Sequence, residues 1–167
     1  LFMNSDSAVK TPHFSLMPLM FQNFSCTLAI MAFVALVGPV ASILSLEAWH
    51  IGVAMTLGGF TWIFCARWWG GLGDRHGRRR VMLLGLSGFT VSYFLLCLFI
   101  DLSLEWLLTP LLAFGGIALG RVIIGVFYAA VPASAAAMVA DNLPANERAG
   151  AMAMLGAATG AGMVVGP

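Results

Sequence analysis

The feature that most constrains this chain is a series of long apolar runs, separated by short charged stretches. Residues 21–46 hold no charged side chain. At a helical rise of 1.5 Å per residue, this run is long enough to cross a hydrocarbon core about 30 Å thick. In the whole chain 60% of residues are hydrophobic and only 9% are charged, whereas soluble domains have about 25% charged residues. The sequence therefore predicts an all-α integral membrane protein.

Dividing the sequence at the charged stretches predicts five apolar spans, at residues 21–46, 51–69, 81–100, 106–140 and 149–167. The fourth run exceeds one bilayer thickness, so it must tilt, break or extend into the cytoplasm, and Pro132 is the expected kink. Residues 1–20 are expected to form a cytoplasmic N-terminal segment. Because the first residue is Leu and Pro167 falls inside a span, we expect an incomplete transmembrane domain, either a fragment or a truncated chain.

Basic residues are expected on one side of the membrane only. The stretch from Gly70 to Arg80 contains four of the eight Lys and Arg residues, and Lys10 and Arg148 fall on the same side of the predicted topology. The connections near residues 47–50 and 101–105 carry acids and no Lys or Arg. Because basic loops stay on the cytoplasmic side, the count predicts a multi-pass protein of the cell (inner or plasma) membrane with a cytoplasmic N-terminus.

Arg121 is a candidate functional residue because it lies well inside a predicted span. A buried guanidinium group is costly in a bilayer, so it should face the bundle interior or a water-filled cavity with a partner. Gly125, Tyr128 and Pro132 share its face at helical spacing, which predicts a shared cavity lining. The alternative is an arginine that snorkels to the outer interface.

Glycines at helical spacing predict close packing between helices. Gly52 and Gly59, with Thr56 between them, mark one face of the second span. In the fifth span the small positions are Gly156, Gly160, Gly162 and Gly166. Such patterns let helix backbones approach each other, and bending of the fifth helix is the weaker alternative.

The charged stretch after the second span contains an acid that topology alone does not explain. Asp74 can cap the following turn or pair with an arginine. The topology brings it to the same surface as Asp141, so we expect Arg78 to pair with both carboxylates. The alternative is that the arginines of this stretch only set the orientation of the chain.

No enzyme chemistry is indicated. The cysteines and histidines show no metal-ligand spacing. The glycine-rich stretch lacks the Lys-Ser/Thr of a nucleotide-binding loop. We therefore expect no catalytic residues, no bound metal or cofactor, and no nucleic-acid partner.

Three motifs resemble those of the major facilitator superfamily of secondary transporters. The stretch Gly70-x-x-x-Asp74-Arg75-x-Gly77-Arg78-Arg79 is similar to the family's loop motif between helices two and three. Arg121-x-x-x-Gly125 resembles the fourth-helix motif, with Ile124 where a glutamine is common. Gly162-x-x-x-Gly166-Pro167 resembles the fifth-helix motif of proton-coupled drug and metabolite antiporters.

The resemblance implies a fold of two six-helix halves with substrate bound at the midplane and alternating access. This chain would supply the first five helices of the N-terminal six-helix bundle. The implied partners are the lipid bilayer, a small-molecule substrate, protons and the missing C-terminal half, and the implied energy source is a proton gradient. The resemblance also implies that the loop motif stabilises the outward-open state through ion pairs that include Asp141.

The function expected from this resemblance is proton-coupled efflux of a small amphipathic drug or metabolite, with Arg121, Gly125 and Tyr128 at the transport cavity. Two alternatives stay open at this point. One is a proton-coupled importer of a small nutrient, and the other is a non-transporting membrane receptor or regulatory fragment.

Overall fold

A computed structural model describes residues 14–106 and 108–167 as α-helices joined by short turns. The helices are α1 (Met17–Ile43), α2 (Ala48–His76), α3 (Arg78–Glu105), α4 (Pro110–Tyr128), α5 (Ala130–Asn142) and α6 (Ala145–Val165). They provide five stretches long and apolar enough to cross a membrane, because α4 and α5 together form one such stretch of 33 residues. Residues 1–13 of the predicted N-terminal segment, including Lys10, lie outside the described residues, and residues 17–20 belong to α1.

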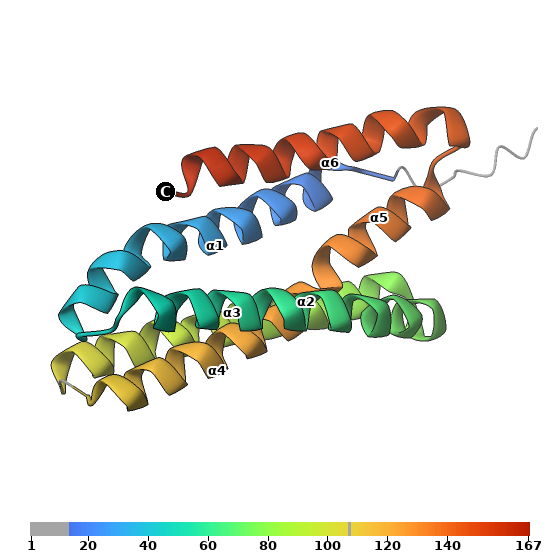
Figure 1. The fold of residues 1–167 in the computed structure, drawn as a ribbon. Helices are drawn as coiled ribbons and strands as arrows, with labels where there is room; N and C mark the ends of the chain where they lie inside the picture. Colours follow the sequence, from blue (N-terminus) through green and yellow to red (C-terminus); the bar gives the residue numbers. More distant parts are fainter. Residues whose placement is uncertain (1–13, 107) are drawn as a thin grey trace, which may run out of the picture.

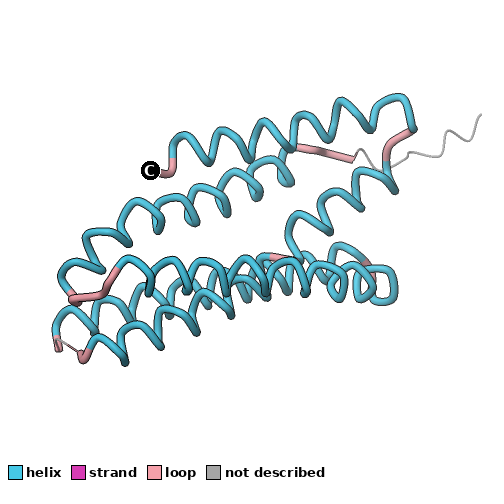
Figure 2. Tube along the Cα trace, viewed as in Figure 1, coloured by secondary structure: helices cyan, strands magenta, loops and turns pink. Residues whose placement is uncertain are grey.

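Helices α1, α2, α3, α4 and α6 run up and down along roughly one direction, and α5 runs obliquely between them (Figure 1). The α1–α2 and α3–α4 connections lie at one end, and the α2–α3 and α5–α6 connections lie at the other, which we call the basic end. Helix α6 packs along α1, while α4 packs against α2 and α3. Helix α5 continues from α4 toward α6 (Figure 2). The architecture is that of an all-α membrane bundle.

The predicted loop at residues 70–80 is almost entirely helical. Helix α2 continues to His76, α3 begins at Arg78, and Gly77 alone separates them. Gly77 has a φ of 92°, a backbone conformation that side chains rarely allow. Because this one glycine makes the whole turn, both helices extend beyond the ends predicted at residues 69 and 81.

The turn predicted at residues 47–50 also lies elsewhere. Helix α1 ends at Ile43, and Glu47 is the N-cap of α2. The Glu47 N–H donates to His50 Nδ1 at 3.1 Å, and the Glu47 side chain accepts from the backbone of the same turn. This reciprocal cap satisfies two N–H groups at the helix start, so residues 48–50 form its first turn.

The predicted fourth span is broken into two helices, one of the possibilities that its length allowed. The break falls at Ala129, between α4 and α5. Pro132 has no N–H to donate to the carbonyl group of Tyr128, and its ring would crowd that carbonyl group in a continuous helix. The predicted polar turn at 141–148 is reduced to Leu143 and Pro144, because α5 ends at Asn142 and α6 begins at Ala145.

Apolar side chains lie both inside the bundle and on its outer surface. Phe33, Leu96 and Ile117 belong to the buried core shared by α1, α3 and α4. Phe64 and Leu111 are about three-quarters exposed, and many other large apolar residues also point outward. Large exposed apolar surfaces are rare on soluble monomers, so these faces fit contact with lipid or with further helices.

Candidate functional site

A cavity of about 140 Å³ lies between α1, α2 and α4. Arg121, Gly125 and Tyr128 of α4 line it together. Their spacing in the sequence predicts this grouping, because residues three and four apart share a helix face. The remaining lining residues are Ile30, Gly58, Gly59, Trp62 and Ile124. Pro132, also predicted on this face, is not among the lining residues.

The Arg121 side chain points into the bundle. Its Nε and Nη1 atoms are buried and have no hydrogen-bond partner among the described residues. The guanidinium carbon lies 5.0 Å from the ring centroid of Phe33 on α1, a distance at which a cation is attracted to an aromatic face. This placement disfavours the snorkelling alternative. It leaves donors free for an oxygen atom from a ligand or from another part of the protein.

Two glycines bring the backbones of α2 and α4 close together beside Arg121. A Cβ atom added to Gly125 would collide with the carbonyl oxygen of Gly58, and one added to Gly58 would lie 3.0 Å from the Arg121 carbonyl oxygen. Gly52 and Gly59, which mark the predicted packing face, have no atom within 4 Å of such a Cβ. The prediction placed the contact on the wrong face of α2, because Gly58 turns toward α4.

The fifth-helix motif packs against α1. A Cβ atom added to Gly162 would lie 2.7 Å from the Phe24 carbonyl oxygen, and one added to Gly166 would lie 2.9 Å from the Leu28 carbonyl oxygen. Gly156 and Gly160 have no such neighbour within 4 Å. Pro167 follows the last helical turn. Two of the four predicted glycines therefore make the close approach.

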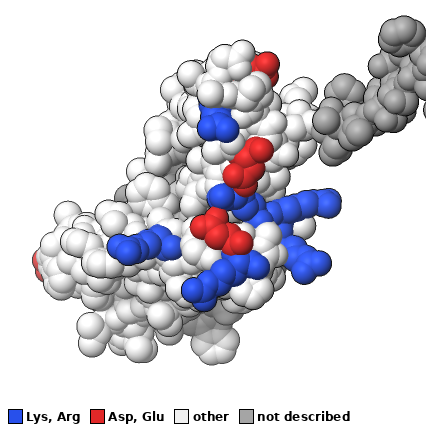
Figure 3. Space-filling view, turned by 90° about the vertical axis from the view of Figure 1, so that its right-hand side faces the viewer, with Lys and Arg blue, Asp and Glu red and all other residues white. Residues whose placement is uncertain are grey.

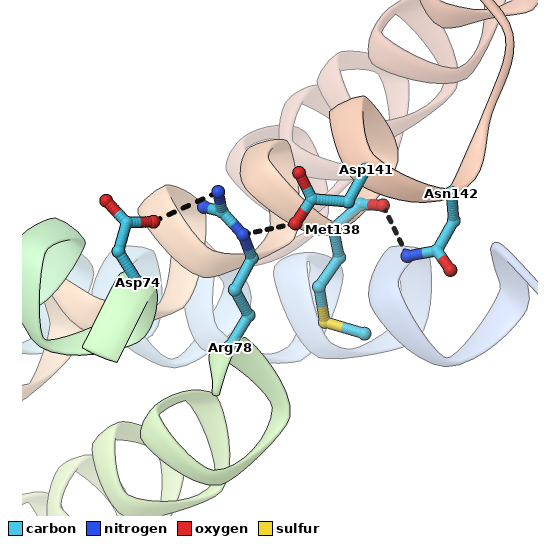
Figure 4. A network of polar contacts seen from close by, with 5 residues as sticks. All are labelled: Asp74, Arg78, Met138, Asp141 and Asn142. Carbon is cyan, nitrogen blue, oxygen red and sulfur yellow. Dashed lines mark hydrogen bonds and ion pairs between the residues drawn. The ribbon is translucent and has the colours of Figure 1, made fainter. Parts of the chain in front are cut away.

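Arg78 joins three helices at the basic end (Figure 4). Its Nη2 lies 3.0 Å from Asp74 Oδ1 near the end of α2, and its Nε contacts Asp141 Oδ2 near the end of α5. The Arg78 side chain is 29% exposed, whereas those of Asp74 and Asp141 are 62% and 51% exposed. Both ion pairs predicted from the sequence are present. They connect α2 and α3 to α5, the helix that directly follows α4, on which Arg121 lies.

Charged side chains gather at the basic end (Figure 3). Arg75 and Arg79, which also belong to the charged motif, form no ion pair with a described residue. Gly70 has no atom within 4 Å of an added Cβ. Of the motif residues, only Asp74, Gly77 and Arg78 have a structural role that is visible in this part of the chain.

Sequence patterns did not single out Phe33, Trp62 or Arg67. Phe33 and Trp62 lie on other helices than Arg121, so no spacing within one helix could assign them to its surroundings. Arg67 lines a separate hollow on α2, which is described below. It lies near the end of a predicted span, where a charged residue is normally interpreted as lying at the membrane–water interface. A usable signal was its spacing from Gly71 and Arg75, which places all three on one face of α2.

Comparison with known proteins gives consistent matches. The family described as Major Facilitator Superfamily matches residues 19–167. The class B tetracycline resistance protein of Escherichia coli is 36% identical over 118 residues, which are 71% of this chain and 26% of that protein. The class D protein of Salmonella ordonez is also 36% identical over 118 residues, 71% of this chain and 27% of that protein. The class G protein of Vibrio anguillarum is 32% identical over 120 residues, 72% of this chain and 27% of that protein.

The chain spans about a quarter of the length of these relatives. The family match, by contrast, extends from within α1 to the last residue and includes all three motifs. The chain belongs to the Major Facilitator Superfamily.

Proposed function

We propose that this chain is the N-terminal part of a transporter that exports a small amphipathic drug or metabolite in exchange for protons. The relatives named above are tetracycline resistance proteins, which supports efflux over nutrient import. The proposed energy source is the proton gradient, with no bound cofactor. The proposed partners are the lipid bilayer, the substrate, protons and the C-terminal half of the transporter.

The observation that carries the proposal is Arg121, whose Nε and Nη1 atoms are buried without a hydrogen-bond partner among the described residues, beside a cavity lined by three helices. An arginine side chain stays protonated in proteins, so Arg121 is not proposed to carry the proton itself. A fixed cation of this kind acts by stabilising an anionic oxygen, either on a nearby carboxylate or on the substrate. In the proposed cycle, Arg121 exchanges such partners as proton and substrate move in opposite directions.

The ion pairs of Arg78 are proposed to act as a gate. They hold the basic ends of α2, α3 and α5 together, so they favour the conformation in which this end is closed. Opening the site toward the cytoplasm would require these pairs to separate. A conformational equilibrium responds to any free energy that differs between its two states.

The basic end is proposed to face the cytoplasm, which also places the N-terminus there. Arg67, Arg75, Arg78 and Arg148 lie at or near this end, and Glu47 and Asp101 lie toward the opposite end. A cysteine introduced at His76 of the full-length protein should resist an impermeant thiol reagent applied to intact cells. Ready labelling from outside would reverse the proposed orientation.

The function is tested by drug accumulation in cells that express the full-length protein. Cells with the protein should accumulate less tetracycline than cells without it, and a protonophore should abolish the difference. Higher accumulation with the protein would indicate an importer. Equal accumulation of tetracycline and of a panel of other amphipathic drugs, at confirmed membrane expression, would contradict the proposed efflux.

A further inference from the structure

A second hollow, of about 450 Å³, lies on the exposed face of α2 near the basic end. Arg67 and Arg75 line it from positions four residues before and after Gly71. No atom lies within 4 Å of the Cβ that Gly71 lacks, so the floor between the two arginines is open. Phe64, Trp68 and Leu72 complete the lining.

The charges in this hollow are unbalanced. Neither Arg67 nor Arg75 forms an ion pair within residues 14–106 and 108–167, and no carboxylate lines the hollow. By contrast, Arg78, which lies two residues beyond the end of α2, contacts two carboxylates. Guanidinium groups present planar sets of donors that match phosphate oxygens. The hollow therefore has the charge and the donors for an anionic group from outside the described residues.

The aromatic part of the hollow is held in place from the core side. Trp69 Nε1 donates to the Val126 carbonyl oxygen of α4 at 2.6 Å. The Trp69 ring packs edge-on against Trp68, with ring centroids 5.0 Å apart. Trp68 is 60% exposed and Phe64 is 74% exposed, so both present apolar surface outward beside the arginines.

The depth of the hollow matches a lipid headgroup. Helix α2 begins at Ala48, so Arg67 lies about 29 Å farther along the helix, close to the thickness of a hydrocarbon core. Arg75 lies about 12 Å beyond Arg67. The lining thus changes along α2 from the aromatic ring of Phe64 to the charge of Arg75, which is the order of acyl chain and headgroup in a lipid.

We propose that this hollow binds an anionic phospholipid of the cytoplasmic leaflet, with Arg67 and Arg75 contacting its phosphate oxygens and Phe64 and Trp68 contacting its apolar part. Charge complementarity and depth favour a lipid over an acidic helix of the same protein. An acidic helix would meet the arginines, but it would not need the gradient from apolar to charged lining. The proposal rests on the orientation given above and not on the direction of transport.

The test is native mass spectrometry of the purified full-length protein after exchange into mixtures of phosphatidylglycerol and phosphatidylcholine. Wild-type protein should retain phosphatidylglycerol in preference to phosphatidylcholine. The double variant Arg67→Gln/Arg75→Gln should retain at least about fivefold less phosphatidylglycerol than the wild type, because it loses both charge-assisted contacts. The matched control Arg79→Gln/Arg80→Gln removes two charges from the same end and should keep it.

A third variant separates loss of the site from loss of the fold. Gly71→Trp keeps both charges but fills the hollow, so it should also lose phosphatidylglycerol retention. An equal loss in the double variant and in its control would mean unspecific attraction and would overturn the proposal. Thermal stabilisation by inorganic phosphate equal to that by phosphatidylglycerol would identify a free anion instead. Efficient disulfide crosslinking of Gly71→Cys to a cysteine on a later helix would identify a helix as the occupant.

Discussion

Two arginines in this chain have opposite surroundings. Arg78, at the basic end, contacts two carboxylates that are more than half exposed. Arg121, inside the bundle, contacts an aromatic ring and has two buried nitrogen atoms without a partner among the described residues. Water screens and partly replaces the interactions of Arg78, so its pairs contribute little individually. Nothing in this part of the chain replaces what Arg121 lacks.

This difference separates a local contact from a functional site. The Arg78 pairs are complete within the chain, so they can act on the relative positions of α2, α3 and α5 without any further group. Arg121 needs an oxygen atom that the described residues do not supply. In the proposed function, a residue in that condition is where proton and substrate exchange partners, because binding and release change the free energy of its surroundings.

The largest expected effect is on Arg121. Arg121→Ala in the full-length protein should lower transport driven by a pH gradient at least about tenfold, because a hydrogen bond to a charged group contributes about 1.5–3 kcal/mol and 1.4 kcal/mol corresponds to a factor of ten. Arg121→Lys should retain part of the transport, since it keeps the charge and loses the planar donor set. The measurement is drug uptake into everted membrane vesicles. Full transport by the Ala variant at equal protein content would place coupling elsewhere.

The packing that positions Arg121 should be nearly as sensitive. Gly125→Ala puts a methyl group against the Gly58 carbonyl oxygen, so it should destabilise the protein by about 1–3 kcal/mol, the range for overpacked interiors. Gly52→Ala adds the same methyl group on α2 where no atom lies within 4 Å, and it should be neutral. Thermal unfolding in detergent gives the comparison. Equal melting temperatures for the two variants would contradict the close approach of α2 and α4.

The turn that positions Arg78 depends on one backbone conformation. Gly77→Ala forces a side chain into a φ of 92°, a strained conformation that should destabilise the connection by about 1–3 kcal/mol. Gly150→Ala is the matched control, because Gly150 lies inside α6 with open space around its Cβ position. Limited proteolysis at the basic end should be faster for the Gly77 variant only. An unchanged rate would show that the turn can adopt another geometry.

The spans and the sidedness of charge follow from the sequence because they depend on local composition. Apolar runs of membrane length specify the helices, and the arginines after residue 74 specify the shared surface on which Arg78 meets Asp141. The grouping of Arg121 with Gly125 and Tyr128 follows from helical spacing alone. These features follow from the composition of single segments and from the topology that those segments imply.

The rest depends on contacts between helices. Gly58 and Gly59 are adjacent in sequence and point about 100° apart on α2, so spacing cannot decide which one meets α4. Phe33 reaches Arg121 from another helix. The extension of α2 to His76 depends on the φ of Gly77, since a glycine-rich stretch is equally compatible with a loop.

The smallest expected effect concerns the ion pairs themselves. Asp74→Asn and Asp141→Asn each remove one contact of Arg78, and each should shift the conformational equilibrium by about 1 kcal/mol or less because the carboxylates are more than half exposed. That shift still changes the ratio of the two conformations by up to roughly fivefold and should impair transport without affecting membrane insertion.

A double-mutant cycle with Arg78→Ala isolates each pair, with solvent accessibility of a cysteine at the opposite end as the readout of conformation. Raising ionic strength should shrink these coupling energies, because exposed charges are screened, while the effect of Arg121→Ala should persist because its guanidinium group is buried. Coupling energies that do not change with ionic strength, or unchanged transport in both Asn variants at equal expression, would contradict a gating role for the Arg78 pairs. They would then be only local contacts between helix ends.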